Sequence, residues 1–415
     1  MHFDTIVIGG GLSGLLCGLK LQRAGQTTAI ISTGQNAMHF SSGAFGLLSR
    51  LPDGTPVEKP LAAIKNLPET HPYSKIGPAR MKQYASGVKT LFASCGVPLV
   101  GEEDRNSYMI SPTGNIKPAW LALSDVTLFP SKDIKVGGKA LIVNLKGYLD
   151  FNTSMIAASL EEHGTACRIE TVELPEMERL RSNPSEMRSV NIARVLESGS
   201  VVASVARTVR ALLQDEDTVI LPSVFGLNGA AALVTIKENI HVNTIFLGTM
   251  PPSVPGIRSQ LLIKKAYEAA GGTFMAGDEV VEASLSEDRL ESVRTVNLGG
   301  MRLTAENFVL ATGSFFSKGL RSTPEKVIEP LLGLDVDFEP SRMDWYDRNF
   351  FAEQKYIGFG VKTDASFHPF KDGRTVSNLY AVGAIIGECN SVKLGCGAGV
   401  AIMTALSAAD SILGE

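Results

Sequence analysis

The stretch Asp4-Thr-Ile-Val-Ile-Gly-Gly-Gly-Leu-Ser-Gly-Leu-Leu-Cys-Gly18 decides the fold of this chain. An apolar run at residues 5–8 enters the turn Gly9-x-Gly11-x-x-Gly14, an apolar helical pattern follows, and residues 27–32 hold a second apolar run. In such a turn the first glycine permits the tight bend, the second lets the backbone approach a phosphate, and the third lets helix pack on strand. A bare glycine triplet is also compatible with a turn in an ordinary α/β unit, but strand, helix and second strand together predict nucleotide binding.

Composition limits the class of protein. The chain has 415 residues, which is more than one hydrophobic core usually serves, so we expect two domains. A net charge of −4, without basic tracts interleaved with aromatic residues, gives no reason to expect a nucleic-acid partner. The five cysteines form no Cys-x-x-Cys pair, so we predict no disulfide framework, iron–sulfur cluster or metal site.

Targeting signals are not evident in the sequence. No run approaches the ~20 apolar residues of a membrane helix, and the N-terminus leads directly into a strand rather than into a basic signal region. We therefore expect a cytoplasmic protein whose contact with a membrane is made only through a partner.

The pattern of elements predicts a discontinuous first domain. Residues 111–254 alternate strands and helices and are expected to form a separate α/β substrate or cap domain. From about residue 255 the pattern returns to a helix that ends at Gly271-Gly272 and to several further strands. Residues 1–110 and 255–415 would then form one nucleotide-binding domain.

Three later glycine clusters strengthen the signal of the opening turn. Val309-Leu-Ala-Thr-Gly313 and Asn378-Leu-Tyr-Ala-Val-Gly383 each read as a strand that ends in glycine. Gly395-Cys-Gly-Ala-Gly399 then opens a long apolar helix, residues 400–413. A helix start directed at a ligand would place partial positive charge near a reduced, anionic group. Each cluster alone could close a loop, but the four in this order favour a flavoprotein.

The same order of motifs resembles the two-domain flavin oxidoreductases, with a Rossmann-like FAD/NAD(P)-binding fold and a second α/β domain. A more specific resemblance covers nearly the whole chain and is to the B subunits of the anaerobic glycerol-3-phosphate dehydrogenases. Besides the opening turn, the motifs that carry it are His39-Phe-Ser-Ser-Gly43, Leu51-Pro-Asp-Gly54, His71-Pro-Tyr-Ser74, Val190-Asn-Ile-Ala-Arg194, Pro251-Pro-Ser-Val254, Gly256-Ile-Arg258, Gly313-Ser-Phe-Phe316, Glu329-Pro330, Gly333-Leu-Asp335 and Gly395-Cys-Gly397.

The resemblance implies oxidation of sn-glycerol 3-phosphate to dihydroxyacetone phosphate, with electrons passed to a quinone and onward to fumarate or nitrate. It implies a heterotrimer on the cytoplasmic face of the inner membrane. The A subunit would carry FAD, the C subunit would carry iron–sulfur clusters and the membrane attachment, and the B subunit is assigned FMN.

The expected cofactor site combines the glycine clusters with the loop that related flavoproteins pass under the flavin ring. Its residues would be Gly9, Gly10, Gly11, Leu12, Ser13, Gly14, Ser32, Thr33, Ser41, Ser42, Gly43, Ala311, Thr312, Gly313, Gly383, Gly395, Gly397 and Gly399.

Two departures from the family pattern bear on the identity of the flavin. A dinucleotide site usually has an acid at the end of the second strand to bind the adenosine ribose, but Ser32 and Thr33 stand there and the next acid is Asp53. Ala384 follows Gly383 where relatives often have glutamate. FMN lacks the adenosine ribose, so we expect FMN, with FAD as the alternative.

Catalysis needs a base for the hydroxyl proton and cations for the substrate phosphate. Arginine suits phosphate because its guanidinium donates two parallel hydrogen bonds, and Arg258 and Arg194 are the candidates. His39, just before the Ser41–Gly43 loop, is the candidate base or flavin contact. Salt bridges on a solvated face remain the alternative role for both arginines.

Two other functions remain open at the level of sequence. The missing acid and Ala384 would also suit a flavoprotein-like docking protein that has lost its cofactor. An independent FAD oxidoreductase acting on another small polyol or hydroxy acid is the other alternative.

Overall fold

The computed structural model describes residues 1–415 and divides into two compact units. Unit 1 comprises Met1–Ala37, Gly46–Val88 and Ile263–Glu415, so it is discontinuous, and unit 2 comprises Met38–Phe45 and Lys89–Leu262. Unit 2 therefore takes in more chain than the 111–254 expected from sequence. The reason is strand pairing: β3 (Ala44–Phe45) and β4 (Leu99–Gly101) both hydrogen-bond to β7 (Leu121–Leu123).

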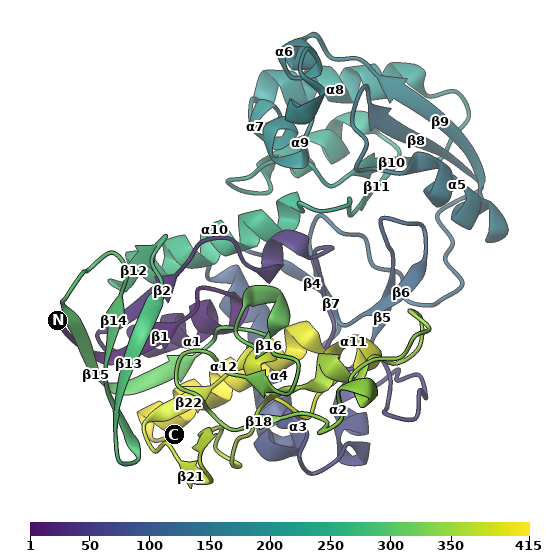
Figure 1. Cartoon of the computed structure of the whole chain (residues 1–415). Coiled ribbons are helices and arrows are strands. Elements are labelled where there is room, and N and C mark those ends of the chain that lie inside the picture. Colours follow the sequence, from purple (N-terminus) through teal and green to yellow (C-terminus); the bar gives the residue numbers. More distant parts are fainter. The chain divides into compact units, whose positions relative to one another are not determined.

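Unit 1 is built on a seven-stranded sheet (Figure 1). Its order is β12-β2-β1-β15-β14-β13, and β22 pairs with the second half of β15. Pairing is parallel from β12 through β2, β1 and β15 to β22, whereas the β13–β14 hairpin is antiparallel. The strands are β1 (His2–Ile8), β2 (Thr28–Ser32), β12 (Thr273–Ala276), β13 (Val280–Ser286), β14 (Arg289–Thr295), β15 (Arg302–Leu310) and β22 (Leu379–Ala381).

Two apolar helices cover this sheet and pack against each other, α1 (Leu12–Arg23) and α12 (Gly397–Leu413). An ion pair between Lys20 and Asp410 links them, and the Tyr84 hydroxyl donates to the other carboxylate oxygen of Asp410 at 2.7 Å. The remaining elements of unit 1 are α2 (Pro60–Ala63), α3 (Pro72–Ile76), α11 (Ser391–Leu394) and the short strands β16 (Arg321–Ser322), β17 (Val327–Ile328), β18 (Val336–Asp337), β19 (Gly360–Val361), β20 (Phe370–Lys371) and β21 (Arg374–Thr375).

Unit 2 contains its own four-stranded parallel sheet, in the order β11-β10-β8-β9. Its strands and helices share one hydrophobic core. They are β8 (Lys139–Leu145), β9 (Ala166–Val172), β10 (Thr218–Pro222), β11 (Asn243–Leu247), α5 (Thr153–Glu162), α6 (Glu178–Arg181), α7 (Ser189–Val195), α8 (Gly199–Leu212) and α9 (Ala231–Ile240). β5 (Ser107–Ile110) and β6 (Ile116–Ala119) form a separate hairpin.

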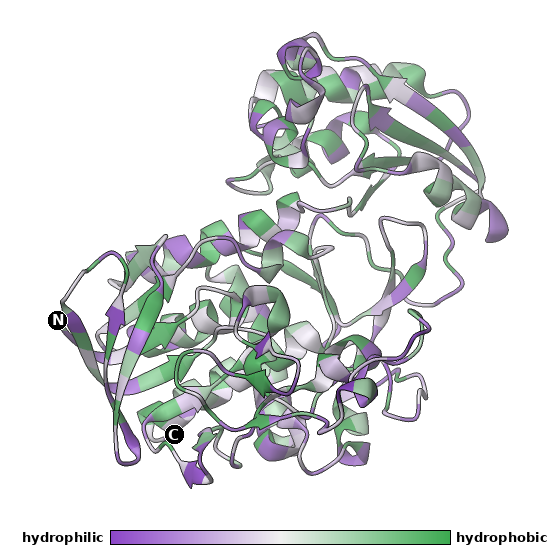
Figure 2. Cartoon of the chain, viewed as in Figure 1, coloured by the Kyte–Doolittle hydropathy of each residue, from purple (hydrophilic) through white to green (hydrophobic).

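Two helices, α4 (Pro78–Ala93) and α10 (Val254–Ala269), each begin in one unit and end in the other. The central parallel strands β2 and β10 are predominantly hydrophobic (Figure 2), as expected of strands that are buried on both faces, whereas the edge strands β9 and β12 are partly exposed. No helix is long and apolar enough to cross a bilayer.

Several local features of the structure follow from neighbouring residues in the sequence. Asn152 caps α5, its side chain accepting from the Met155 amide at 3.1 Å. Trp120, Phe129 and Cys17 are buried. Within residues 111–254, where the sequence predicted alternating strands and helices, β8 and α9 are not marked by any distinct sequence signal.

The three glycines of the opening turn differ in their surroundings, which gives a first prediction. A Cβ at Gly14 would lie 1.9 Å from the Gly9 carbonyl oxygen, whereas a Cβ at Gly11 would meet nothing within 4 Å. Gly14→Ala should therefore lower the free energy of unfolding of unit 1 by about 1–3 kcal/mol, the usual cost of overpacking. Gly11→Ala is the matched control and should change it by no more than about 0.5 kcal/mol. Thermal unfolding of the cofactor-free protein measures both; equal losses would contradict this packing.

Candidate cofactor site

The turn between β1 and α1 lies directly against the end of β15. Gly9 has φ +120°, and a Cβ there would come within 2.3 Å of the Ala311 carbonyl oxygen. The Gly9 amide donates to the Ile31 carbonyl at 2.9 Å, and the Ala311 amide donates to the Ile8 carbonyl at 2.8 Å. The β1, β2 and β15 ends are thus hydrogen-bonded together at the carboxyl edge of the parallel strands, where ligands bind in folds of this kind.

The start of α1 has the features of an anion site. Gly11 is its N-cap in extended backbone, no side chain caps it, and no acidic residue stands in the first turn. The first amides of a helix point outward and lie at the positive end of its dipole. Because the space in front of Gly11 is open, a phosphate could approach this backbone closely.

The Ala311-Thr312-Gly313 segment supplies an unpaired hydroxyl beside this turn. Thr312 Oγ1 is buried and has no hydrogen-bond partner. A buried hydroxyl without a partner is costly, so such a group often marks a site for a ligand. The open space at Gly11, the uncapped helix and this hydroxyl fit a flavin phosphate and its attached chain.

Gly383 follows β22 and lies against the first turn of α1. A Cβ at Gly383 would lie 2.6 Å from Ser13 Oγ, and the Gly383 amide donates to Thr404 Oγ1 at 2.9 Å. Thr404 is a fully buried polar residue within the apolar helix α12. Thr404 was not among the predicted site residues, and the sequence of α12, which also contains Ser407, Asp410 and Ser411, does not single it out.

The start of α12 lies against the chain that follows residue 45. A Cβ at Gly395 would meet the Ser49 side chain at 2.7 Å, and the Gly399 amide donates to the Gly46 carbonyl at 2.9 Å. Gly397 has only a loose neighbour, Ser391, at 3.6 Å. The Gly399 amide is therefore occupied within the protein, whereas the amides that begin α12 have no partner within the helix.

The end of β2 lies against the turn between β1 and α1. Ser32 is buried, and its Oγ would lie 2.5 Å from a Cβ at Gly10, whereas Thr33 is exposed. Asn36, which the sequence analysis overlooked, donates from Nδ2 to the Gly10 carbonyl at 2.8 Å. The carboxylate of Asp53 stabilises its own turn instead, because it accepts from the Thr55 amide.

A buried acid from the neighbouring strand lies beside the end of β2. Asp278 follows β12, and its amide donates to the Ser32 carbonyl at 3.1 Å. Its carboxylate accepts from the amides of Glu279 and Asn297 at 2.9 and 3.0 Å. Asp278 is thus a buried acid at the end of β2 that no reading of β2 alone could locate.

The remaining predicted cofactor residues belong to unit 2. Ser41 Oγ accepts from the Gly43 amide at 3.1 Å, and Ser42 Oγ donates to Met109 Sδ at 3.8 Å. Gly43 has φ +86° and is buried. His39 is half-buried, and its Nε2 is hydrogen-bonded to Gln260 Oε1.

Arg258 lies in α10 and is buried, with 5% of its surface exposed. Its Nη2 is 2.6 Å from Asp125 Oδ1, and its Nη1 donates to the carbonyls of Phe225 and Gly226 at 3.1 and 2.8 Å. Oδ2 of Asp125 has no hydrogen-bond partner. The guanidinium thus ties α10 to two loops of unit 2.

The three predicted catalytic residues are not gathered at one point. His39 contacts Gln260, two positions from Arg258 on α10, and residues two apart on a helix point to different sides. Arg194 is exposed on α7 and donates to Asn191 Oδ1 at 3.1 Å, one turn away. The catalytic roles of these residues remain predictions.

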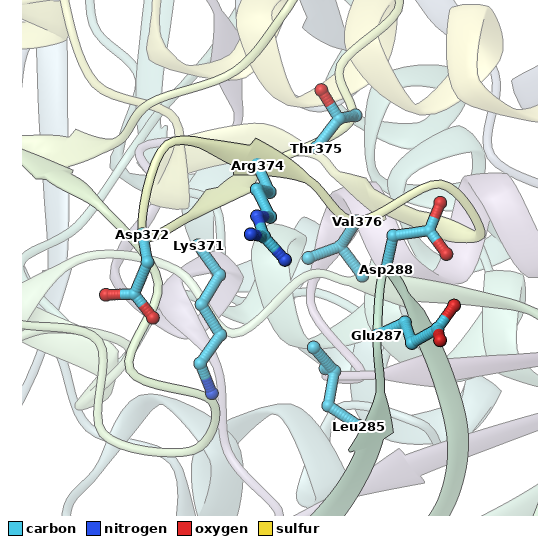
Figure 3. A pocket seen from close by; sticks show the side chains of 8 residues that line it. All are labelled: Leu285, Glu287, Asp288, Lys371, Asp372, Arg374, Thr375 and Val376. Atoms are coloured by element: carbon cyan, nitrogen blue, oxygen red, sulfur yellow. The ribbon is translucent and has the colours of Figure 1, made fainter.

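A separate cavity of about 390 Å³ lies between the tips of the β13–β14 and β20–β21 hairpins (Figure 3). Figure 3 shows Arg374 at its centre, Lys371 and Asp372 on one side, and Glu287 and Asp288 on the other. None of its lining residues belongs to the glycine clusters. Its mixture of charges gives it no clear preference for an anionic ligand.

The contacts of Arg258 give a second prediction. Arg258→Met should lower the free energy of unfolding of unit 2 by about 3–5 kcal/mol, because Asp125 would be left as an unpaired buried charge. Arg258→Met combined with Asp125→Asn should recover much of that loss, as measured by chemical denaturation. If the single variant is as stable as the unmodified protein, Arg258 is free for an anionic ligand instead.

Comparison with known proteins agrees with this geometry. The family model described as FAD binding domain matches residues 4–400. The curated protein named as the B subunit of anaerobic glycerol-3-phosphate dehydrogenase in Yersinia enterocolitica is 39% identical, over all of this chain and 98% of its own length. The proteins of the same name from Pectobacterium carotovorum and Pasteurella multocida are 39% and 35% identical, over all of this chain and 99% and 100% of theirs.

Among solved structures, the 3-ketosteroid delta1-dehydrogenase of Sterolibacterium denitrificans is 12% identical and has a TM-score of 0.45, covering 100% of this chain and 99% of its own. The expectation of FMN receives no support from these findings, because the matching family is an FAD-binding one. The chain belongs to the family of anaerobic glycerol-3-phosphate dehydrogenase B subunits, flavin-dependent oxidoreductases built on the FAD-binding fold.

Proposed function

We propose that this chain is the flavin-carrying B subunit of a multi-subunit enzyme that oxidises sn-glycerol 3-phosphate to dihydroxyacetone phosphate and delivers the electrons to a quinone. The observation that carries the proposal is the open, uncapped start of α1 in front of Gly11. The names of relatives that match over the full length supply the substrate.

Each part of the site has a proposed role toward the flavin. The α1 amides bind the phosphate, and the Thr312 hydroxyl supplies a hydrogen bond that it lacks within the protein. The start of α12, Gly397 above all, is directed at the ring, where the positive end of the helix dipole stabilises negative charge. When bound, the flavin accepts the two electrons of alcohol oxidation.

FAD is the flavin we propose. The matching family model is an FAD-binding one, and a second phosphate with an adenosine would extend from the turn toward Ser32 and Thr33. The missing acid after β2 does not oppose this, because the Ser32 and Thr33 hydroxyls offer hydrogen bonds in its place.

Within the complex we propose that this chain relays electrons rather than removes the first hydride. The contacts of Arg258 support a relay. Its guanidinium is already paired with Asp125 and donates to two carbonyls, so few of its N–H groups remain to bind a substrate phosphate. The designation of the relatives as B subunits supports a complex. Its partners would be an FAD-carrying A subunit, itself a dehydrogenase, and an iron–sulfur C subunit that attaches the complex to the membrane.

A third prediction concerns the cofactor cradle. Gly11→Val should reduce the flavin content per chain about tenfold or more, because the added methyl groups fill the space that the phosphate needs. Absorbance and mass spectrometry of the flavin released on denaturation measure content and identity, and FAD is the expected mass. Gly87→Val, at another open glycine on α4, is the control and should keep its flavin. An unmodified chain purified without any flavin would favour the docking-protein alternative instead.

A fourth prediction separates relay from first acceptor. Under anaerobic conditions glycerol 3-phosphate should leave the flavin absorbance of the isolated chain unchanged and bleach it in the reconstituted complex. Rapid bleaching of the isolated chain would show that it oxidises the substrate itself. Reduction of the isolated chain by another polyol or hydroxy acid alone would support the independent-oxidoreductase alternative.

A further inference from the structure

Three buried residues to which the proposed cofactor site assigns no role bring sulfur and nitrogen atoms together. Cys389 Sγ lies 3.4 Å from His71 Nε2 and 3.5 Å from Cys396 Sγ. His71 precedes α3, Cys389 follows β22, and Cys396 is the N-cap of α12, so the cluster joins three separate segments of the chain. No bond between the sulfurs is present, since both cysteines are free thiols.

The three ligand atoms lie within 4.8 Å of one another, a spacing that a metal ion could also satisfy. The hydrogen bonding of His71 opposes that interpretation. Its Nδ1 accepts from the Tyr73 amide at 3.1 Å, and a backbone N–H can only donate. In the neutral ring the proton therefore resides on Nε2, which faces Cys389 and cannot bind a metal in that state.

The same proton makes His71 a donor to sulfur. With Nε2–H directed at Cys389 and the Cys396 thiol donating from the other side, negative charge is stabilised on Cys389. The hydrogen bond from Cys396, aided by that from His71, lowers the pKa of Cys389 to about 6 against the effect of burial. The pKa of Cys396 is raised well above its ordinary value, because it donates to that neighbour.

We propose that Cys389 and Cys396 are a reversible dithiol–disulfide pair that hydrogen peroxide oxidises, with Cys389 as the attacking sulfur and His71 as its positioning residue. The exposure of the two thiols agrees with these roles. Cys389 has 7% of its surface exposed, whereas Cys396 has none. Only a small oxidant would reach such a site.

The backbone around the pair supports this assignment. Glu388, directly before Cys389, has φ +62°, a conformation that non-glycine residues rarely adopt and that collects at functional sites. Tyr73 stacks edge-on against His71, with ring centroids 4.9 Å apart, and its hydroxyl donates to the Leu47 and Cys396 carbonyls. Lys75 and Glu388 form an ion pair at 3.9 Å beside the cluster.

The reaction has two steps. The Cys389 thiolate attacks one oxygen of the peroxide, so that an S–O bond forms, the O–O bond breaks, hydroxide leaves, and Cys389 becomes a sulfenic acid. The Cys396 sulfur then attacks Cys389, the S–O bond breaks, and water leaves as the disulfide forms. In total two thiols and one peroxide give one disulfide and two waters, and a dithiol reductant reverses the oxidation.

The geometry permits closure with local movement. A disulfide is about 2.05 Å long, so the two sulfurs must approach by about 1.5 Å from their present 3.5 Å. Closing the bond would link the loop after β22 to the first turn of α12 across the short helix α11.

The experiment follows from the sequence between the cysteines. The full-length protein, reduced and freed of reductant, is treated with stoichiometric hydrogen peroxide, alkylated and digested with trypsin. Because Lys393 separates the two cysteines, a disulfide joins the peptides Thr375–Lys393 and Leu394–Glu415 and removes two hydrogens from their combined mass. We expect that cross-linked product, its loss on treatment with dithiothreitol, and full alkylation of Cys167, which is more accessible but has a raised pKa of about 11.

Three variants test the individual roles. Cys396→Ser should leave Cys389 as a sulfenic acid that dimedone traps, and Cys389→Ser should leave Cys396 unoxidised. His71→Asn retains a side chain that caps α3 but removes the Nε2–H donor, so the pKa of Cys389 should rise by about one unit and iodoacetamide should alkylate Cys389 about tenfold more slowly at pH 5, below that pKa.

Complete alkylation of all five cysteines after peroxide treatment would overturn the proposal. So would one equivalent of bound metal in the purified protein that is absent from His71→Asn. An unchanged rate of Cys389 alkylation in His71→Asn, with the circular dichroism spectrum preserved, would overturn the role of His71.

Discussion

The cofactor cradle depends on the close contact between the Gly9–Gly14 turn and the end of β15. Gly9 and Gly14 both approach backbone so closely that no side chain fits, and Ala311 lies against both. This contact exists because β15, some three hundred residues along the chain, pairs in parallel with β1 from Thr304 to Leu310. Without that pairing the turn would be an isolated bend, and Thr312 would not stand beside it.

From this contact the rest of unit 1 follows. β22 adds to the free half of β15 and delivers Gly383 to Ser13, while Thr404 holds the Gly383 amide from α12. Parallel strands place their carboxyl ends at one edge, so the three glycine clusters that follow β1, β15 and β22 arrive at the same edge of the sheet although they are scattered in sequence. The start of α12, which we propose faces the flavin, has Cys396 of the cysteine pair as its N-cap.

Unit 2 is held together differently. Its parallel sheet forms a core of its own, and Arg258 ties α10 to the loops after β7 and β10 through a buried ion pair and two carbonyls. A buried pair of this kind is costly to break from one side. The sequence alone suggested a phosphate contact for Arg258, because it does not show which acid or carbonyl groups bond to the guanidinium in the folded protein.

The sequence by itself determined the local elements and the family. The glycine turn, the Asn152 cap and the apolar runs of β1, β2 and α12 are read from neighbouring residues, because their causes lie within a few positions of the chain. The tertiary structure alone decided the unit boundaries, the partner of Arg258 and the acid at the end of β2, which comes from Asp278 beyond β12. It also decided the meeting of His71, Cys389 and Cys396, because such contacts are set by strand order and helix packing across hundreds of residues.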